Sequence, residues 1–236
     1  MKVQLLFLLL AATLAPLCYG LVDEASTYLA PDLDSCDCSE TADDKVLARD
    51  YICGDIMLGP TRVPRKLPLN TFVSGYNRFG GLTPGDFLKK WTNPSNRSRW
   101  IYPKEDGFHL DKDGAAIKGT MVLEVGTLVD RFGLETGNFI SAADAPFSQR
   151  ALPPDSLNTN AKAPDYPYNY HLYKVIKNLT VEGGPITPWF GQPGLGAQFH
   201  IGNIGNILKL KEMGYLEELD PSEPRSWTSV CPFQTA

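Results

Sequence analysis

The side chains best suited to chemistry gather in a stretch at residues 183–199, which holds five glycines, three prolines and three aromatic residues. Glycine permits unusual backbone angles and proline fixes φ, so this loop is expected to be bent and stiff. Trp189 and Phe190 can form a pocket wall, and Gln198 adds an amide that donates and accepts hydrogen bonds. The stretch lacks the patterns of phosphate-binding loops, and its alternative is an ordinary packed crossover loop.

Four blocks in chain order carry a family resemblance. They are Asp130-Arg131-Phe132-Gly133, Arg150-Ala151-Leu152-Pro153-Pro154, Tyr170-His171-x-Tyr173-x-Val175, and Pro188 to Gln198. Over roughly residues 100–218 they resemble the tuberculosis necrotizing toxin (TNT) domain family, including its branch of secreted NADases on fungal spores. The resemblance implies hydrolysis of the nicotinamide–ribose bond of NAD⁺ or NADP⁺, with no cofactor beyond this substrate.

Three polar residues are the first candidates for that reaction. Arg131 and Arg150 match site arginines of the family, and a guanidinium grips pyrophosphate oxygens in a two-pronged geometry that lysine lacks. Gln198 matches the family's essential glutamine, whose amide can hold the ribose or nicotinamide side and orient the attacking water. The alternatives are a structural ion pair for each arginine and a loop-stabilising amide for Gln198.

Aromatic residues are the candidates for holding the nicotinamide ring or the developing ribosyl cation. Phe132 and Trp189 offer such faces, and Phe139, Tyr173 and Phe190 complete the predicted substrate-binding set. As ordinary core aromatics, all five would look the same in the sequence. Phe139 stands where the bacterial toxin has a tyrosine, so a mechanism that depends on that hydroxyl is not expected here.

His171 and Glu135 are the candidates for moving protons or steadying charge. His171 aligns with a functional histidine of the toxin, and histidine can exchange protons near neutral pH. A satisfied histidine within a strand explains it equally well. Many NAD glycosidases of other families use a carboxylate to steady the ribosyl cation. Glu135 and Asp130 lie beside Arg131, and either acid could instead only hold that arginine in place.

An acidic run near the C-terminus suggests a metal site. Fungal members of the family bind calcium, and Glu218, Asp220 and Glu223 would supply the hard oxygen ligands that calcium prefers. The run lacks an EF-hand pattern, and its alternative is a solvated charged face. A homodimer is also implied by the fungal relatives and by nothing in the sequence pattern.

Strands are the main elements that must position these residues. Residues 126–133 alternate apolar and polar side chains, which predicts a strand with Arg131 and Phe132 at its end. Residues 170–181 predict one long strand, after which Gly183-Gly184 is expected to turn the chain into the glycine- and proline-rich loop. This pattern indicates an α+β fold with a mostly antiparallel sheet and a few short helices.

Two helices have clear start or stop signals. Thr83, Pro84 and Asp86 form a capping pattern that predicts a short helix with one apolar side. Residues 203–213 predict a second helix, capped by Asn203 and ended by Gly214.

The cysteines and the first 20 residues indicate export. Residues 1–20 have the charged start, short apolar run and small residues of a secretory signal peptide. The cysteines that remain after its removal are Cys36, Cys38, Cys53 and Cys231. Two disulfides are therefore expected. Cys36 and Cys38 are too close to pair, so either one bridges to Cys53 and the other to Cys231. We therefore divide the chain into a signal peptide (1–20), a cysteine-bearing extension (21–70) and a TNT-like domain (71–236).

Composition limits the partners and the location of the protein. A net charge of −5 over 236 residues argues against non-specific nucleic-acid binding. No apolar run is long enough to span a membrane. A secreted, extracellular or cell-surface protein is expected, with N-glycosylation sequons at Asn96 and Asn178 that should lie at the surface.

Two other functions fit the same residues. An ADP-ribosyltransferase or cyclase would use the same substrate but yield modified protein or cyclic ADP-ribose. A catalytically inactive surface module would only bind a nucleotide or a partner, although the presence of Arg131, Arg150 and Gln198 argues against it.

Overall fold

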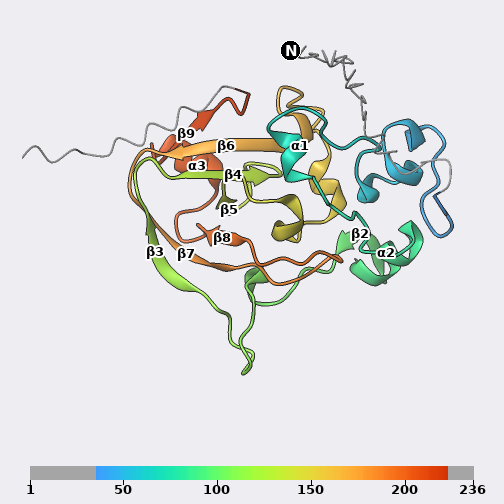
Figure 1. Ribbon diagram of the computed structural model, residues 1–236, viewed down its shortest axis with the longest axis horizontal. Coiled ribbons are helices and arrows are strands. Elements are labelled where there is room, and N and C mark those ends of the chain that lie inside the picture. The colour runs from blue at the N-terminus through green and yellow to red at the C-terminus, as the bar shows by residue number, and fades with distance from the viewer. Residues whose placement is uncertain (1–35, 223–236) are drawn as a thin grey trace, which may run out of the picture. The chain divides into compact units, whose positions relative to one another are not determined.

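A curved antiparallel sheet of seven strands forms the centre of the fold in the computed structural model, which describes residues 36–222 (Figure 1). The strand order is β3-β7-β8-β5-β4-β6-β9. In chain order the strands are β3 (Gly119–Leu123), β4 (Leu128–Phe132), β5 (Phe139–Ala142), β6 (Tyr170–Val175), β7 (Leu179–Pro185), β8 (Ala197–His200) and β9 (Leu216–Leu219). A small hairpin pairs β1 (Thr92–Asn93) with β2 (Asn96–Trp100). The predicted α+β class is confirmed.

The helices in the described residues are short. The α-helices are α1 (Leu69–Phe72), α2 (Pro84–Trp91) and α3 (Ile207–Glu212). The 3-10 helices are η2 (Leu47–Arg49), η3 (Ile52–Gly54), η4 (Ile56–Leu58), η5 (Glu105–Gly107), η6 (Phe147–Arg150), η7 (Pro154–Leu157) and η8 (Pro167–Asn169). Between residues 36 and 222, no helix has the length and apolar character that crossing a membrane requires.

The predicted helix starts are right for α2 and wrong for α3. The Thr83 side chain accepts a hydrogen bond from the Asp86 backbone N–H, and Pro84 is the first residue of α2. The second helix begins later than predicted because Asn206, not Asn203, is its cap: the Asn206 side chain accepts from the Lys209 backbone N–H at 3.0 Å.

The single strand predicted over residues 170–181 is wrong, because it is two strands. β6 ends at Val175 and pairs with β4 and β9, whereas β7 begins at Leu179 and pairs with β3 and β8. The exposed residues between the two strands carry the chain from one half of the sheet to the other. Alternation continues across this break, so the sequence pattern did not reveal it.

The turn predicted at Gly183-Gly184 is also wrong, since both glycines lie inside β7. These glycines allow another segment of the chain to approach the β7 backbone closely. A Cβ atom on Gly184 would lie 2.2 Å from the backbone carbonyl oxygen of Ile117. The segment before β3 therefore packs directly on the β7 backbone, and only glycine fits there.

Two apolar cores cover the sheet. The first contains Val129, Tyr173, Phe199 and the buried α3 residues Ile207 and Leu210. The second contains α1, Phe132, Phe147, Leu157, Tyr170 and Leu172. Because successive strand residues point to opposite faces, Phe132 and Val129 of β4 enter different cores.

A third core joins the N-terminal region to the glycine- and proline-rich loop. Ile52 and Leu58 pack with Phe87 and Leu88 of α2 and with Phe190. A disulfide links Cys38 to Cys53, which is one of the two pairings left open by the sequence. The other bond of that pairing would join Cys36 to Cys231, which lies outside the described residues, as do the signal peptide and Glu223.

We expect Gly184→Ala to destabilise the protein by about 1–3 kcal/mol, because the added methyl group must displace the Ile117 backbone. Gly119→Ala is the matched control, since Gly119 lies in β3 and a Cβ there meets nothing within 4 Å. Thermal unfolding of the two variants checks this prediction, and equal melting temperatures would contradict it.

Candidate functional site

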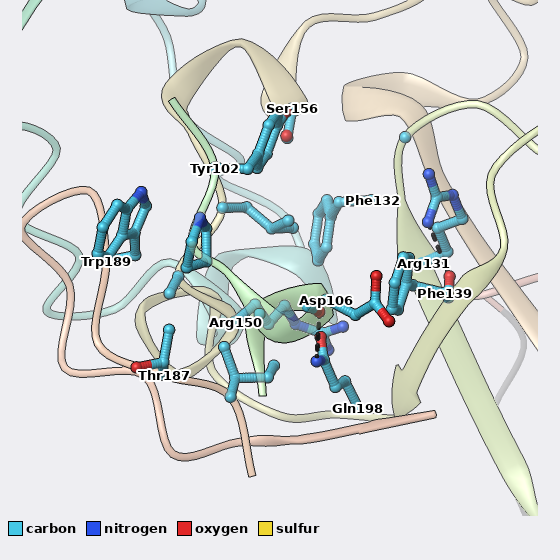
Figure 2. Close-up of a pocket in the computed structure, with 16 residues that line it drawn as sticks. Tyr102, Asp106, Arg131, Phe132, Phe139, Arg150, Ser156, Thr187, Trp189 and Gln198 are labelled. Carbon is cyan, nitrogen blue, oxygen red and sulfur yellow. Dashed lines mark hydrogen bonds between the residues drawn. The ribbon is translucent and has the colours of Figure 1, made fainter. Parts of the chain in front are cut away.

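A cavity of about 460 Å³ opens where β4 ends and β5 begins (Figure 2). Its lining comes from widely separated segments: Tyr102, Pro103, Asp106, Gly107, Arg131, Phe132, Gly133, Phe139, Arg150, Ala151, Leu152, Ser156, Ile186, Thr187, Trp189 and Gln198. A volume of this size lies within the range of about 300–1,000 Å³ that is usual for small-molecule sites.

Six of the catalytic and substrate-binding residues predicted from the sequence line this cavity. They are Arg131, Arg150, Gln198, Phe132, Phe139 and Trp189. The remaining candidates Glu135, His171, Tyr173 and Phe190 are not among the lining residues. The candidate residues thus divide into six that line the cavity and four that do not.

Gln198 is fixed by one end of its amide. The residue lies on β8 between Ser141 of β5 and Gly184 of β7, and its side chain is buried. Its Nε2 donates to the backbone carbonyl of Asp106 at 3.0 Å, as the dashed line in Figure 2 shows. Its Oε1 has no hydrogen-bond partner among the described residues, so this oxygen is available to a ligand or water.

Arg150 forms a buried ion pair. Its Nη2 donates to Asp130 Oδ2 at 2.8 Å, its Nη1 donates to Asp130 Oδ1, and both side chains are almost fully buried. Nε and Nη2 also donate to the backbone carbonyl of Ala145. Asp130 accepts a further bond from the Tyr170 hydroxyl at 3.1 Å. Asp130, which was considered as a partner of Arg131, therefore holds Arg150.

Arg131 has a different environment. Its Nε donates to the backbone carbonyl of Leu134 at 2.8 Å and its Nη1 to that of Phe139 at 2.7 Å. Burial lowers the pKa of this guanidinium, but arginine stays protonated in proteins. Its Nη2 has no hydrogen-bond partner among the described residues. Figure 2 shows the guanidinium turned toward the segment after β4 and away from Gln198.

Aromatic rings form the apolar walls. Phe132 lies under the Arg150 guanidinium at 5.2 Å, and Phe139 stacks on His200 at 4.7 Å. The indole N–H of Trp189 donates to the Ile101 carbonyl at 2.7 Å. Phe190 is buried in the third core, where its ring lies 5.7 Å from that of Tyr102. Phe190 therefore supports a wall of the cavity from behind.

A second polar group, which we call the Lys211 cluster, contains Glu135, His171, Tyr173, Lys211 and Glu218. Tyr173 and Lys211 each donate to Glu135 Oε1 at 2.8 Å, and Lys211 also donates to Glu218. His171 lies 3.1 Å from Glu218. Burial alone would lower the pKa of Lys211, but the hydrogen bonds that its ammonium donates to both carboxylates outweigh burial and raise the pKa. Glu135, His171 and Glu218 are close enough to hold a metal ion, but the Lys211 ammonium already bridges the two carboxylates.

The predicted calcium ligands are not shown to meet. Glu218 belongs to the Lys211 cluster, whereas Asp220 accepts hydrogen bonds from Ser222. The calcium site stays a prediction. Both sequon asparagines, Asn96 and Asn178, are exposed, as a glycosylation site requires.

Several lining residues were not predicted from the sequence. Asp106 is an exposed residue in the left-handed region, with φ of 55°. Thr187 lies in the glycine- and proline-rich loop. Tyr102 begins the segment whose Tyr-Pro and Gly-Phe pairs (102–103 and 107–108) resemble the start of the TNT domain, but this resemblance did not mark Tyr102 as a site residue. Ser156 lies two residues beyond the end of the Arg150 block, which closes at Pro154.

Asp155 has a shifted protonation equilibrium beside the cavity. Burial raises its pKa from 3.8 to about 6, although its carboxylate accepts a hydrogen bond from the Trp100 indole at 3.0 Å.

Comparisons with known proteins show the family to which the chain is similar. The family model described as Tuberculosis necrotizing toxin matches residues 122–219. The conidial surface nicotinamide adenine dinucleotide glycohydrolase of Aspergillus fumigatus is 48% identical over 174 residues, which cover 73% of this chain and 73% of that protein. The solved structure of tuberculosis necrotizing toxin complexed with its immunity factor is 19% identical, with a TM-score of 0.44, and covers 74% of this chain and 82% of that one.

We expect Arg150→Met to destabilise the protein by about 3–5 kcal/mol, because it leaves the Asp130 carboxylate buried without its cation. Adding Asp130→Asn should recover much of this loss, since the buried charge is then gone. Denaturant unfolding of both single variants and the double variant checks the coupling. A loss below about 1 kcal/mol for Arg150→Met, as for a surface pair, would contradict it.

We expect Asp155→Asn to become more stable relative to the wild type as pH rises from 4 to 7. The folded protein binds the Asp155 proton more tightly than the unfolded chain does, so the wild type loses that stability as pH passes through the folded pKa of about 6. The relative gain approaches roughly 3 kcal/mol. Denaturant unfolding across this pH range measures it, with exposed Asp113→Asn as control. A pH-independent difference would contradict the assignment.

Proposed function

We propose that this chain, which belongs to the tuberculosis necrotizing toxin family, is an NAD⁺ glycohydrolase that acts at the cell surface or outside the cell. It cleaves the bond between nicotinamide and ribose and releases nicotinamide and ADP-ribose. The observation that carries the proposal is the cavity, which gathers arginines, an amide and aromatic rings from separate segments. The Aspergillus fumigatus relative is named as a conidial surface enzyme of this activity, which supports both the reaction and the location.

The two arginines have separate tasks in substrate binding. Among residues 36–222, Arg131 Nη2 has no hydrogen-bond partner, so this group can donate to a pyrophosphate oxygen. The charge of Arg150 is compensated by Asp130, so Arg150 contributes mainly by fixing Phe132 and the wall of the cavity. An exposed or half-buried ring such as Trp189 or Phe139 then holds the nicotinamide.

The chemistry needs little proton transfer at the start. The leaving group is a pyridine that departs neutral, so no acid has to protonate it. The glycosidic electron pair leaves with the ring nitrogen, and the ribose becomes a cation of oxocarbenium character. Gln198 Oε1 is an acceptor at the cavity that can orient the attacking water, because its Nε2 is already held by Asp106.

Four finer properties belong to the same proposal. NADP⁺ is a second substrate, since the Arg131 Nη2 that meets the pyrophosphate makes no demand on the 2′ position. Calcium binds near Glu218 and Asp220, as the acidic run suggests. The protein is glycosylated at the exposed Asn96 and Asn178. It forms a homodimer, which only the resemblance to fungal relatives supports.

We expect the purified secreted protein to convert NAD⁺ into equal amounts of nicotinamide and ADP-ribose, separated by chromatography. Because both side chains meet the substrate, kcat/KM should fall about 100-fold in Gln198→Ala and about 10-fold in Arg131→Ala. Lys112→Ala is a matched control on an exposed loop and should leave turnover unchanged.

Other product patterns would point to other functions. Cyclic ADP-ribose would indicate a cyclase, and ADP-ribosylated protein would indicate a transferase. Suppose that NAD⁺ raises the melting temperature but no turnover occurs with calcium present and the disulfides intact. That result would contradict the enzyme hypothesis and indicate a nucleotide-binding module.

A further inference from the structure

Asp106 adds a carboxylate to the cavity beside the groups that bind the substrate and orient water in the proposed reaction. Among the described residues that line the cavity, Asp106 is the acidic one. Arg131 and Arg150 belong to the same lining. Its carboxylate accepts no hydrogen bond and forms no ion pair with any described residue. Figure 2 shows this carboxylate on the side of the cavity where Phe139 and Gln198 lie. An unpaired carboxylate in a ligand-sized cavity is available to a cationic ligand.

The backbone fixes where this carboxylate lies. Asp106 is the middle residue of η5 and has a left-handed φ of 55°. Its carbonyl accepts from Gln198 Nε2 at 3.0 Å, and the next carbonyl, that of Gly107, accepts from the Thr187 backbone N–H at 2.9 Å. One short segment therefore orients the Gln198 amide with its backbone and presents the carboxylate beside it.

The arginines do not neutralise Asp106. Arg150 is compensated by Asp130, and Arg131 donates to the carbonyls of Leu134 and Phe139. The negative charge of the Asp106 carboxylate is therefore available to interact with a substrate that enters the cavity. In the proposed reaction, positive charge moves from the nicotinamide ring to the ribose as the bond breaks, and a nearby carboxylate stabilises that cation.

We propose that Asp106 is a catalytic residue of the glycohydrolase, an inference that rests on the proposed function. The C1′–N bond breaks, and its electron pair goes to the pyridine nitrogen. The Asp106 carboxylate faces the ribosyl cation so formed. Water held by Gln198 Oε1 attacks C1′ and gives one proton to Asp106, which releases it to solvent. The products are nicotinamide, ADP-ribose and one proton, so atoms and charge balance.

Asp106→Asn tests the charge with little change of shape. Asparagine tolerates the left-handed backbone, and the backbone carbonyl of residue 106 still accepts the hydrogen bond from Gln198 Nε2. We expect kcat to fall about 100-fold or more. The affinity for ADP-ribose, measured by calorimetry, should stay unchanged because this product lacks the ribosyl cation. The exposed Asp113→Asn is the matched control and should keep full activity.

Asp106→Gly is the second variant, since glycine also accepts this φ. Added formate should restore part of its turnover by placing a carboxylate in the vacated space. This rescue is not expected of a residue whose role is only structural.

The outcomes separate the two claims. If the wild type does not hydrolyse NAD⁺, the proposed function fails. If the wild type is active but Asp106→Asn keeps kcat within about threefold, Asp106 is not catalytic and the function stands. Equal losses of kcat and ADP-ribose affinity, without rescue of Asp106→Gly by formate, would also overturn the inference.

Discussion

The buried pair of Asp130 and Arg150 is the interaction on which the cavity depends. Asp130 lies within β4, and Arg150 ends η6 in the long connection between β5 and β6. A charge buried without its partner costs several kcal/mol, roughly 3–5, so this connection has to return to β4. Its return places Ala151, Leu152 and the Phe132–Arg150 contact on the cavity wall. The wall is thus set by electrostatics as well as by apolar packing.

Short sequence patterns correctly predicted those helix and strand ends that depend only on neighbouring residues. The Thr83 cap and the end of β4 at Gly133 follow from side-chain chemistry and backbone freedom within a few residues. The break between β6 and β7 is decided elsewhere, because each strand takes different partners in the sheet. Gly184 is similar: its neighbour Ile117 is distant in sequence, so a glycine kept for close approach looked like a turn.

The candidate site was predictable where residues lie in the recognised blocks, and the assignment within a block was weaker. Arg131 and His171 are direct partners across β4 and β6, yet only Arg131 lines the cavity. His171 is directed into the Lys211 cluster by Glu218. Trp189 and Phe190 are adjacent, but one faces the cavity and the other fills the third core. Arg131 and His171 share one face of the sheet as cross-strand partners, and Trp189 and Phe190 lie in a loop outside the strands. Alternation along a strand therefore separates neither pair, and the sequence does not say which member reaches the cavity.

Hydrogen-bond accounting distinguishes the two polar groups. Buried polar groups in proteins are nearly always paired, and in the Lys211 cluster Glu135, His171, Lys211 and Glu218 all have partners. At the cavity, by contrast, Gln198 Oε1 and Arg131 Nη2 lack hydrogen-bond partners among the described residues, and the carboxylate of the exposed Asp106 has none there either. The Lys211 cluster therefore supports the segment after β4 through Glu135, while the incompletely paired groups are those that a substrate would complete. Asp106 lies between the Tyr-Pro and Gly-Phe pairs (102–103 and 107–108). No residue pattern singles it out within that segment, and its place in the cavity lining identifies it.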